Sequence, residues 1–127
     1  MEALAAELLA GVAFVDTLDA VSEEAFRAMY GIEEDGVEVE NYALYAGTGA
    51  TAEEVAVMEA ADEDGAKALE EAARGRIEAQ KDGFENYNSG ELAKLDAAVL
   101  VRKGRYVALC VSDDSAEAER IIEDYFK

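Results

Sequence analysis

The chain has 127 residues, 30 of them acidic and 11 basic, and it contains one cysteine and no histidine, proline or tryptophan. The formal net charge of −19 argues against binding to nucleic acid or to anionic lipid, because both need lysine and arginine to neutralise phosphate groups. The lack of histidine excludes Ser-His-Asp and Cys-His catalysis and histidine-ligated zinc sites, and one cysteine cannot form an internal disulfide bond.

Hydrophobic residues make up 51% of the chain, which is enough for one hydrophobic core, and the length predicts a single domain over residues 1–127. No run of about 18 apolar residues is present, so we expect that this domain does not insert into a membrane. The sequence opens on a helical pattern and not on a signal peptide, so a signal segment and lipobox, if the precursor has them, are absent from this chain.

The first part of the chain predicts two helices and a strand. Residues 2–15 have apolar side chains at helical spacing, which places them on one face. These side chains are Ala5, Leu8, Leu9, Val12 and Val15. Ser22 is a good N-cap for a second helix, which Gly31 ends. A turn is expected at residues 33–36, and residues 41–47 predict a strand.

Residues 51–61 fit two kinds of secondary structure equally well. Thr51 and Glu54 form the pattern of a capping box, and the many alanine and glutamate residues favour a helix. Val55 and Val57 recur instead at the spacing of a strand. Propensity alone does not separate the two.

The second part predicts a long helix followed by a hairpin. Residues 65–85 carry their core-facing side chains at helical spacing, followed by a loop at 86–90 and a helical turn at 91–95. Residues 97–102 and 105–112 predict a β-hairpin, with its turn centred on Lys103-Gly104. Both strands are apolar on both faces, which is typical of central strands covered on each side.

Asp114 and Glu117 form the pattern of a capping box at the start of a last helix. The expected core face of this helix consists of Ala118, Ile121, Ile122, Tyr125 and Phe126. The elements then follow the order α-α-β-β-α-β-β-α. This order predicts an α+β fold, in which helices pack on a mostly antiparallel sheet of about four strands.

Two sets of side chains are candidates for a binding site. Tyr42, Tyr45 and Tyr87 are expected at element ends or in loops, where they could line a ligand pocket, although tyrosine is also common at the edge of a core. The basic residues that flank the hairpin turn are Arg102, Lys103 and Arg105. They fit either a docking patch on an acidic surface or charges that protect a sheet edge and pair with neighbouring acids.

The remaining polar features indicate structural roles. The segment 62–65 (DEDG) resembles the start of a calcium loop, but its glycine stands at position 4 and not at position 6, which favours a helix N-terminus. Adjacent acids such as Glu53-Glu54 are interpreted as solvated faces, and Cys110 lies in an apolar strand, which favours a packing role. We therefore predict no catalytic residue, no metal site and no cofactor.

Several segments, taken in order, resemble a bacterial family known as domain of unknown function 4358. They are Leu18-Asp19 through Met29-Tyr30-Gly31-Ile32, residues 51–60, residues 76–81 with Phe84 and Tyr87, residues 95–99, and residues 104–113. The resemblance covers nearly the whole chain and implies a small secreted lipoprotein of Gram-positive bacteria, tethered outside the membrane by a lipid anchor on an upstream lipobox cysteine. It also implies a strand for the segment matching residues 53–61, and it carries over no catalytic residue.

Three functions follow as hypotheses. The first is a non-catalytic, extracytoplasmic domain that binds a protein or small-molecule partner through an exposed apolar or aromatic patch. The second is a structural module that forms a homodimer through a sheet edge or a helix face. The third is an enzyme that uses carboxylates, with or without a divalent metal, and it ranks last because the sequence offers no pair of nucleophile and base.

Overall fold

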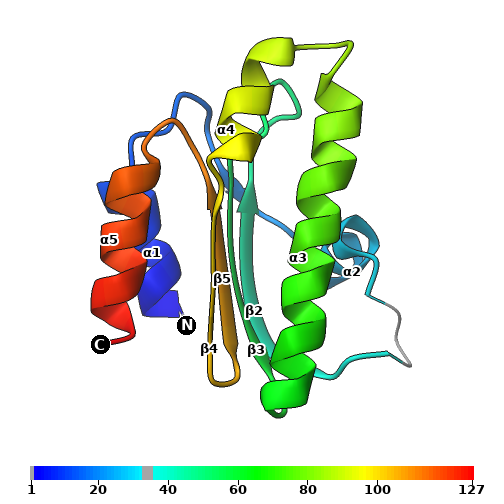
Figure 1. Ribbon diagram of the computed structural model, residues 1–127, viewed down its shortest axis with the longest axis vertical. Helices are drawn as coiled ribbons and strands as arrows, with labels where there is room; N and C mark the ends of the chain where they lie inside the picture. Colours follow the sequence, from blue (N-terminus) through cyan, green and yellow to red (C-terminus); the bar gives the residue numbers. More distant parts are fainter. Residues whose placement is uncertain (1, 33–35) are drawn as a thin grey trace.

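A five-stranded antiparallel sheet forms the centre of the protein, with helices on both of its faces (Figure 1). The computed structural model describes residues 2–32 and 36–127. The strands are β1 (Asp19–Ala20), β2 (Val39–Ala46), β3 (Glu54–Ala60), β4 (Val99–Lys103) and β5 (Tyr106–Val111), in the spatial order β1-β2-β3-β5-β4. The expected α+β fold is confirmed, and the two-residue strand β1 is an addition that the sequence did not predict.

The helices form one layer on each side of the sheet (Figure 1). One layer consists of α1 (Glu2–Gly11) and α5 (Ser115–Tyr125), and the other of α2 (Glu23–Tyr30) and α3 (Glu63–Phe84). A short 3-10 helix, Ser89–Glu91, and α4 (Leu92–Asp96) follow α3 and lie at the end of the sheet where β3 begins. Among the described residues, no helix is long and apolar enough to cross a membrane.

The central strand β3 supplies both halves of the core. Ala56 and Met58 face the layer of α2 and α3, whereas Val55 and Val57 face the layer of α1 and α5. Both faces of β3 are therefore buried, which removes the apolar–polar alternation that normally marks a strand. The strand implied by the family resemblance is confirmed, and the alternative capping box at Thr51 is wrong.

Local capping sets the ends of the inner helices. The Ser22 hydroxyl accepts a hydrogen bond from the Ala25 N–H at 3.3 Å, and Gly31 ends α2 with a φ of 64°, as predicted. Asp62 caps α3 by accepting from the Gly65 N–H at 2.7 Å, so the acidic segment 62–65 is a helix N-terminus. Except for residue 36, the turn predicted at residues 33–36 lies outside the described residues.

Three predictions about the outer helices are wrong, one of them the core position of Tyr125, which is 39% exposed. Helix α1 ends at Gly11 and not at residue 15, and the Val15 side chain is 76% exposed instead of facing the core. Asp114 precedes α5, but within the described part of the chain its side chain forms no capping bond. It instead accepts a hydrogen bond from the Ala13 N–H at 3.3 Å, which connects the segment after α1 to the start of α5.

The β4–β5 hairpin is confirmed, with two corrections. Lys103 pairs with Tyr106, so the two turn residues are Gly104 and Arg105, one position later than predicted. Gly104 has a φ of 59° whereas Arg105 does not have a positive φ, which fits a type II′ turn. Strand β5 is central as expected, but β4 is an edge strand. Its apolar side chains face both ways because α3 and α5 extend over both of its faces.

Candidate functional site

Charged side chains gather inside the protein at the end of the sheet where β3 begins. Glu53 and Glu54 are 1% and 2% exposed, so the prediction that they form a solvated face is wrong. Since successive residues of a strand point to opposite faces, the two carboxylates enter different layers of the fold. Each carboxylate organises its own set of contacts.

Glu53 holds the loop that follows α1. Its carboxylate accepts hydrogen bonds from the backbone N–H groups of Val15 at 3.0 Å and Asp16 at 2.7 Å. The Lys94 ammonium group of α4 lies 3.4 Å from the same carboxylate. These bonds pull the chain away from the helical path after Gly11, which explains why α1 is shorter than its apolar pattern predicts.

Lys94 joins α4 to the rest of this cluster. Its ammonium group is 3.1 Å from the Glu91 carboxylate and 3.8 Å from that of Asp113. Burial opposes the charge on Lys94, but the hydrogen bond with Glu91 and the charges of Glu53, Glu91 and Asp113 outweigh it and raise the pKa of Lys94. Glu91 also accepts from the Ala52 N–H at 2.7 Å, so the cluster fixes the loop before β3.

Glu54 forms a second cluster on the other face of the sheet. Its carboxylate accepts hydrogen bonds from the Tyr30 hydroxyl at the end of α2 and from the Arg76 guanidinium of α3, the latter at 2.9 Å. Burial and the neighbouring Glu54 charge raise the pKa of Tyr30 well above its ordinary value, so Tyr30 stays a donor. A hollow of about 150 Å³ beside this pair is lined by Gly47, Gly49, Thr51, Arg76, Gln80 and Phe84, among others.

Asp16 closes the end of the sheet from outside. Its carboxylate accepts hydrogen bonds from the Thr48 N–H at 2.9 Å and the Thr51 hydroxyl at 2.8 Å, which hold the pKa of Asp16 below its ordinary value. A Cβ on Gly47 would lie 2.4 Å from an Asp16 carboxylate oxygen, so a side chain at this position would displace the Asp16 carboxylate. The loop after α1 and the loop before β3 are therefore fastened to each other.

The polar end of the sheet is built to hold loops together. Among the described residues, Glu53, Glu54, Lys94 and Arg76 each take part in hydrogen bonds or ion pairs with neighbouring elements. No group of three or more acidic or cysteine side chains in the described ranges could hold a metal ion. Burial raises the pKa of the Cys110 thiol to about 12, which keeps this cysteine protonated and unreactive.

The three candidate tyrosines do not form one surface. Tyr42 stacks on Phe26 with ring centroids 4.6 Å apart, and its hydroxyl donates to the Val21 carbonyl oxygen at 3.0 Å. Tyr45 packs on the opposite face of the sheet, toward α1 and α5. Tyr87 is 70% exposed and lies beyond the end of α3, next to Phe84. A shared pocket of the three is therefore not formed.

The candidate basic residues do lie together at the β4–β5 hairpin. Arg102 pairs with Glu70 of α3 at 3.1 Å, and Arg105 pairs with Glu59 of β3 at 2.9 Å. Lys103 is exposed and has no ion-pair partner among the described residues. Two of the three charges are thus neutralised locally, and only Lys103 is available to a partner.

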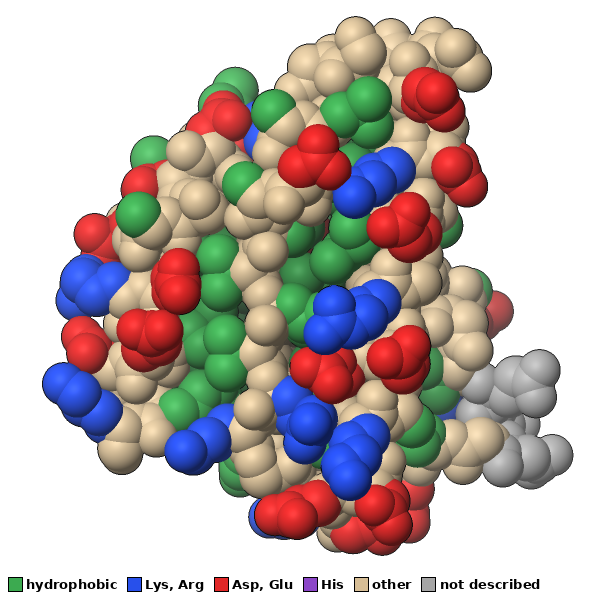
Figure 2. Space-filling view, viewed as in Figure 1, with side chains coloured by type: hydrophobic (Ala, Val, Ile, Leu, Met, Phe, Trp, Pro, Cys, Tyr) green, Lys and Arg blue, Asp and Glu red, His purple; other side chains and the backbone are tan. Residues whose placement is uncertain are grey.

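The edge of the sheet at β4 has partly buried apolar side chains on both sides of its backbone. Figure 2 shows green side chains on both sides of the backbone column between α5 and α3, which Figure 1 identifies as β4. We define the β4 edge surface as the outer backbone of β4 together with the partly buried side chains beside it. These are Ile77, Ala98 and Leu100 on the α3 side and Val101 and Phe126 on the α5 side.

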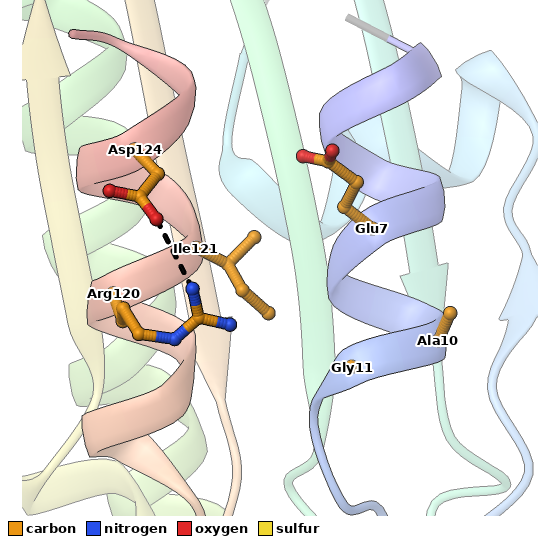
Figure 3. Close-up of a pocket in the computed structure, with 6 residues that line it drawn as sticks. All are labelled: Glu7, Ala10, Gly11, Arg120, Ile121 and Asp124. Atoms are coloured by element: carbon orange, nitrogen blue, oxygen red, sulfur yellow. Dashed lines mark hydrogen bonds and ion pairs between the residues drawn. The ribbon is translucent and has the colours of Figure 1, made fainter.

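A second opening lies between the two outer helices (Figure 3). This groove has a volume of about 350 Å³, and its lining comes from Glu7, Ala10 and Gly11 of α1 and from Arg120, Ile121 and Asp124 of α5. Arg120 pairs with Asp124 at 3.1 Å, and Ile121 points toward α1. Because a Cβ on Gly11 would lie 2.7 Å from the Ile121 Cδ1, glycine allows the two helices to approach here.

A family model described as Domain of unknown function (DUF4358) matches residues 13–112, which is most of the chain. The chain therefore belongs to this family. The match contains the whole sheet with α2, α3 and α4, while α1 and α5 lie outside it. Neither a curated protein nor a solved structure matches the chain.

Proposed function

We propose that this member of the DUF4358 family is a non-catalytic interaction domain, and that it binds a polypeptide along the β4 edge surface. We further propose that it acts outside the cytoplasmic membrane, tethered by a lipid anchor on an upstream segment. The resemblance described above supports this location, since it implies a secreted lipoprotein. An acidic surface and a single buried thiol suit such a compartment.

The open edge of β4 carries the proposal. An edge strand presents unpaired backbone N–H and C=O groups, and proteins normally protect them with charges, bulges or covering elements. The opposite edge has all three, since β1 pairs with the end of β2, the β2 register shifts between Val39 and Asn41, and Glu38 and Glu40 are exposed. On β4 the charges stand only at the hairpin end, which leaves the stretch 99–101 open to an added strand.

The use of the buried charges supports a non-catalytic role. A general acid or base must reach the proton that it transfers within hydrogen-bond distance of the substrate. The Glu53 carboxylate accepts its bonds from backbone amides and Lys94, and the Glu54 carboxylate accepts from Tyr30 and Arg76. These groups serve to connect the loops and helices that surround β3.

A peptide selection tests the proposed mode of binding. The wild-type chain is immobilised at low density, so that β4 edges of neighbouring molecules do not meet, and is exposed to a displayed library of random peptides. We expect enrichment of peptides with alternating β-branched or aromatic residues, since strand addition reads alternate side chains.

Two variants of one residue show whether the selected peptides use the β4 edge. Arg102→Pro and Arg102→Ala both remove the ion pair with Glu70, but only proline removes the backbone N–H. We expect binding to survive Arg102→Ala and to be lost in Arg102→Pro. Equal binding to both variants, or no enrichment on the wild-type chain, would contradict the proposed function.

A further inference from the structure

We infer that the polypeptide which the β4 edge takes is a second copy of this chain, paired antiparallel to the first about a twofold axis at Leu100. This inference rests on the proposed interaction role of the β4 edge surface and names its partner. In this arrangement two five-stranded sheets join into one continuous sheet, with the helical layers of both copies side by side.

The backbone of β4 has the alternation that such a pairing needs. Lys103 and Tyr106 flank the two-residue turn and form a hydrogen-bonded pair, so Val101 and Val99 also bond toward β5. The N–H and C=O groups of Leu100 and Arg102 consequently face outward. A twofold axis at Leu100 sets this residue opposite its own copy, so that the two Leu100 residues exchange N–H···O=C bonds. Each Arg102 N–H then faces the Ala98 carbonyl oxygen of the other copy, while the Ala98 N–H keeps its bond to the Leu95 carbonyl oxygen.

The side chains match in the same register. The axis at Leu100 brings the two Leu100 side chains together on the α3 face and sets Val101 of one copy opposite Val99 of the other on the α5 face. Ile77 extends the α3 face of the contact. It lies on the same side of α3 as Glu70, which pairs with Arg102 of β4, and Lys81, which pairs with Asp96 at the end of α4.

The charges on the α3 face are also complementary under this symmetry. Arg102 pairs with Glu70 of α3 and therefore lies on the α3 face, where it stands opposite Ala98 of the second copy. Asp96, two residues before Ala98, lies on the same face because it pairs with Lys81 of α3 at 3.0 Å, and its side chain is 69% exposed. Each Arg102 of the dimer therefore lies near an Asp96 carboxylate of the other copy.

The opposite edge of the sheet explains why the assembly closes at two copies. A head-to-tail chain would require β4 of one copy to meet β2 of the next. Strand β1, the irregular register at Val39 and Asn41, and the exposed Glu38 and Glu40 obstruct that contact. The β4 edge can meet its own copy, and the symmetric pair leaves no further β4 edge open.

Sedimentation measurements on the full chain test the dimer. We expect the mass to rise from 13.6 kDa toward twice that value as the concentration increases between about 1 µM and 1 mM, the range of weak association. Since each copy carries a net charge of −19, added salt should strengthen the dimer by screening the repulsion. Arg102→Pro should weaken dimerisation about tenfold or more relative to Arg102→Ala, because only proline removes an outward N–H from each copy.

A distance measurement tests the register independently of any effect of proline on folding. A spin label on Lys103→Cys reacts selectively, since Cys110 is buried. The two labelled positions are six residues apart along the joined strands, so their Cα atoms should be about 20 Å apart. A monomer throughout the concentration range, a dimer equally stable in both Arg102 variants, or a clearly different distance would overturn the dimer. A monomer that still binds selected peptides through β4 leaves the proposed function standing, whereas a monomer that binds none contradicts both.

Discussion

Replacing Glu53 by alanine is expected to lower the free energy of unfolding by about 3–5 kcal/mol, the range for removing one partner of a buried ion pair. The side chain is fully buried and accepts hydrogen bonds from the backbone N–H groups of Val15 and Asp16. Hydrogen bonds to a charged group contribute about 1.5–3 kcal/mol each, so these two amides alone account for that range. In this variant the Lys94 ammonium group still has the Glu91 carboxylate 3.1 Å away. The charge of Lys94 is therefore not left unpaired and adds little to the loss of stability.

Two further variants separate charge from packing. Glu53→Gln retains an oxygen that can accept from the amides but loses the charge next to Lys94, so its cost should fall between that of alanine and zero. Glu78→Ala removes an exposed carboxylate, 72% accessible and 3.6 Å from Lys81, and serves as the surface control. It should cost no more than about 0.5 kcal/mol, because exposed pairs contribute little.

Urea unfolding measures these differences. The free energy of unfolding falls by about 1–3 kcal/mol per molar urea. A loss of about 4 kcal/mol, the middle of the range expected for Glu53→Ala, therefore lowers the urea concentration at the unfolding midpoint by about 2 M. Hydrogen exchange should show faster exchange of the Val15 and Asp16 amides in Glu53→Ala, because these amides lose their acceptor. A loss below about 1 kcal/mol, or unchanged exchange at both amides, would refute the assignment of Glu53 as the anchor of this loop.

Three further measurements address other parts of the fold. In urea titrations, Gly47→Ala should destabilise the protein by about 1–3 kcal/mol, because its Cβ would lie 2.4 Å from an Asp16 oxygen. Gly75→Ala should instead stabilise α3 by about 0.5–1 kcal/mol, because its Cβ meets no described atom within 4 Å. The stability difference between wild type and Asp16→Asn should be constant above about pH 4 and shrink as the pH falls through the lowered pKa of Asp16; a difference that persists at lower pH would contradict the hydrogen bonds assigned to it. Cys110 should resist a thiol reagent at neutral pH in the folded protein and react fully in urea, since burial raises its pKa to about 12; rapid reaction of the folded protein would show that the strand is open.

The elements that sequence analysis predicted correctly are those with local causes. The Ser22 cap, the Gly31 end of α2 and the apolar spacing of α3 each depend on residues close together in the chain. The hairpin was predicted for the same reason. Its turn was placed one residue too early because both Lys103-Gly104 and Gly104-Arg105 can form a two-residue turn. Strand β1 has no pattern of its own and exists because β2 offers it an edge.

The buried charges were missed because their causes are distant in the sequence. Among 30 acidic residues, nothing local distinguishes Glu53 and Glu54 from solvated neighbours. Their burial depends on Lys94 and Arg76, which are 41 and 22 residues away. The sequence offered one clue to these clusters, the small number of basic residues. In so acidic a protein, each lysine or arginine, such as Lys94, is expected to have an acidic partner. The edge position of β4 was equally hidden, because helices on both sides give an edge strand the composition of a central one.

The charge clusters around Glu53 and Glu54 explain how the sheet can remain open along one side. Because Glu53 and Glu54 are consecutive, the start of β3 is attached to both helical layers at once, through Lys94 and Val15 on one side and Arg76 on the other. The loops at this end are therefore held without any contribution from the outer backbone of β4. The residues that stabilise the fold and the residues that would bind a partner lie at different places on the sheet. Changes on the β4 edge surface can consequently alter association while the charge clusters that hold the fold remain intact.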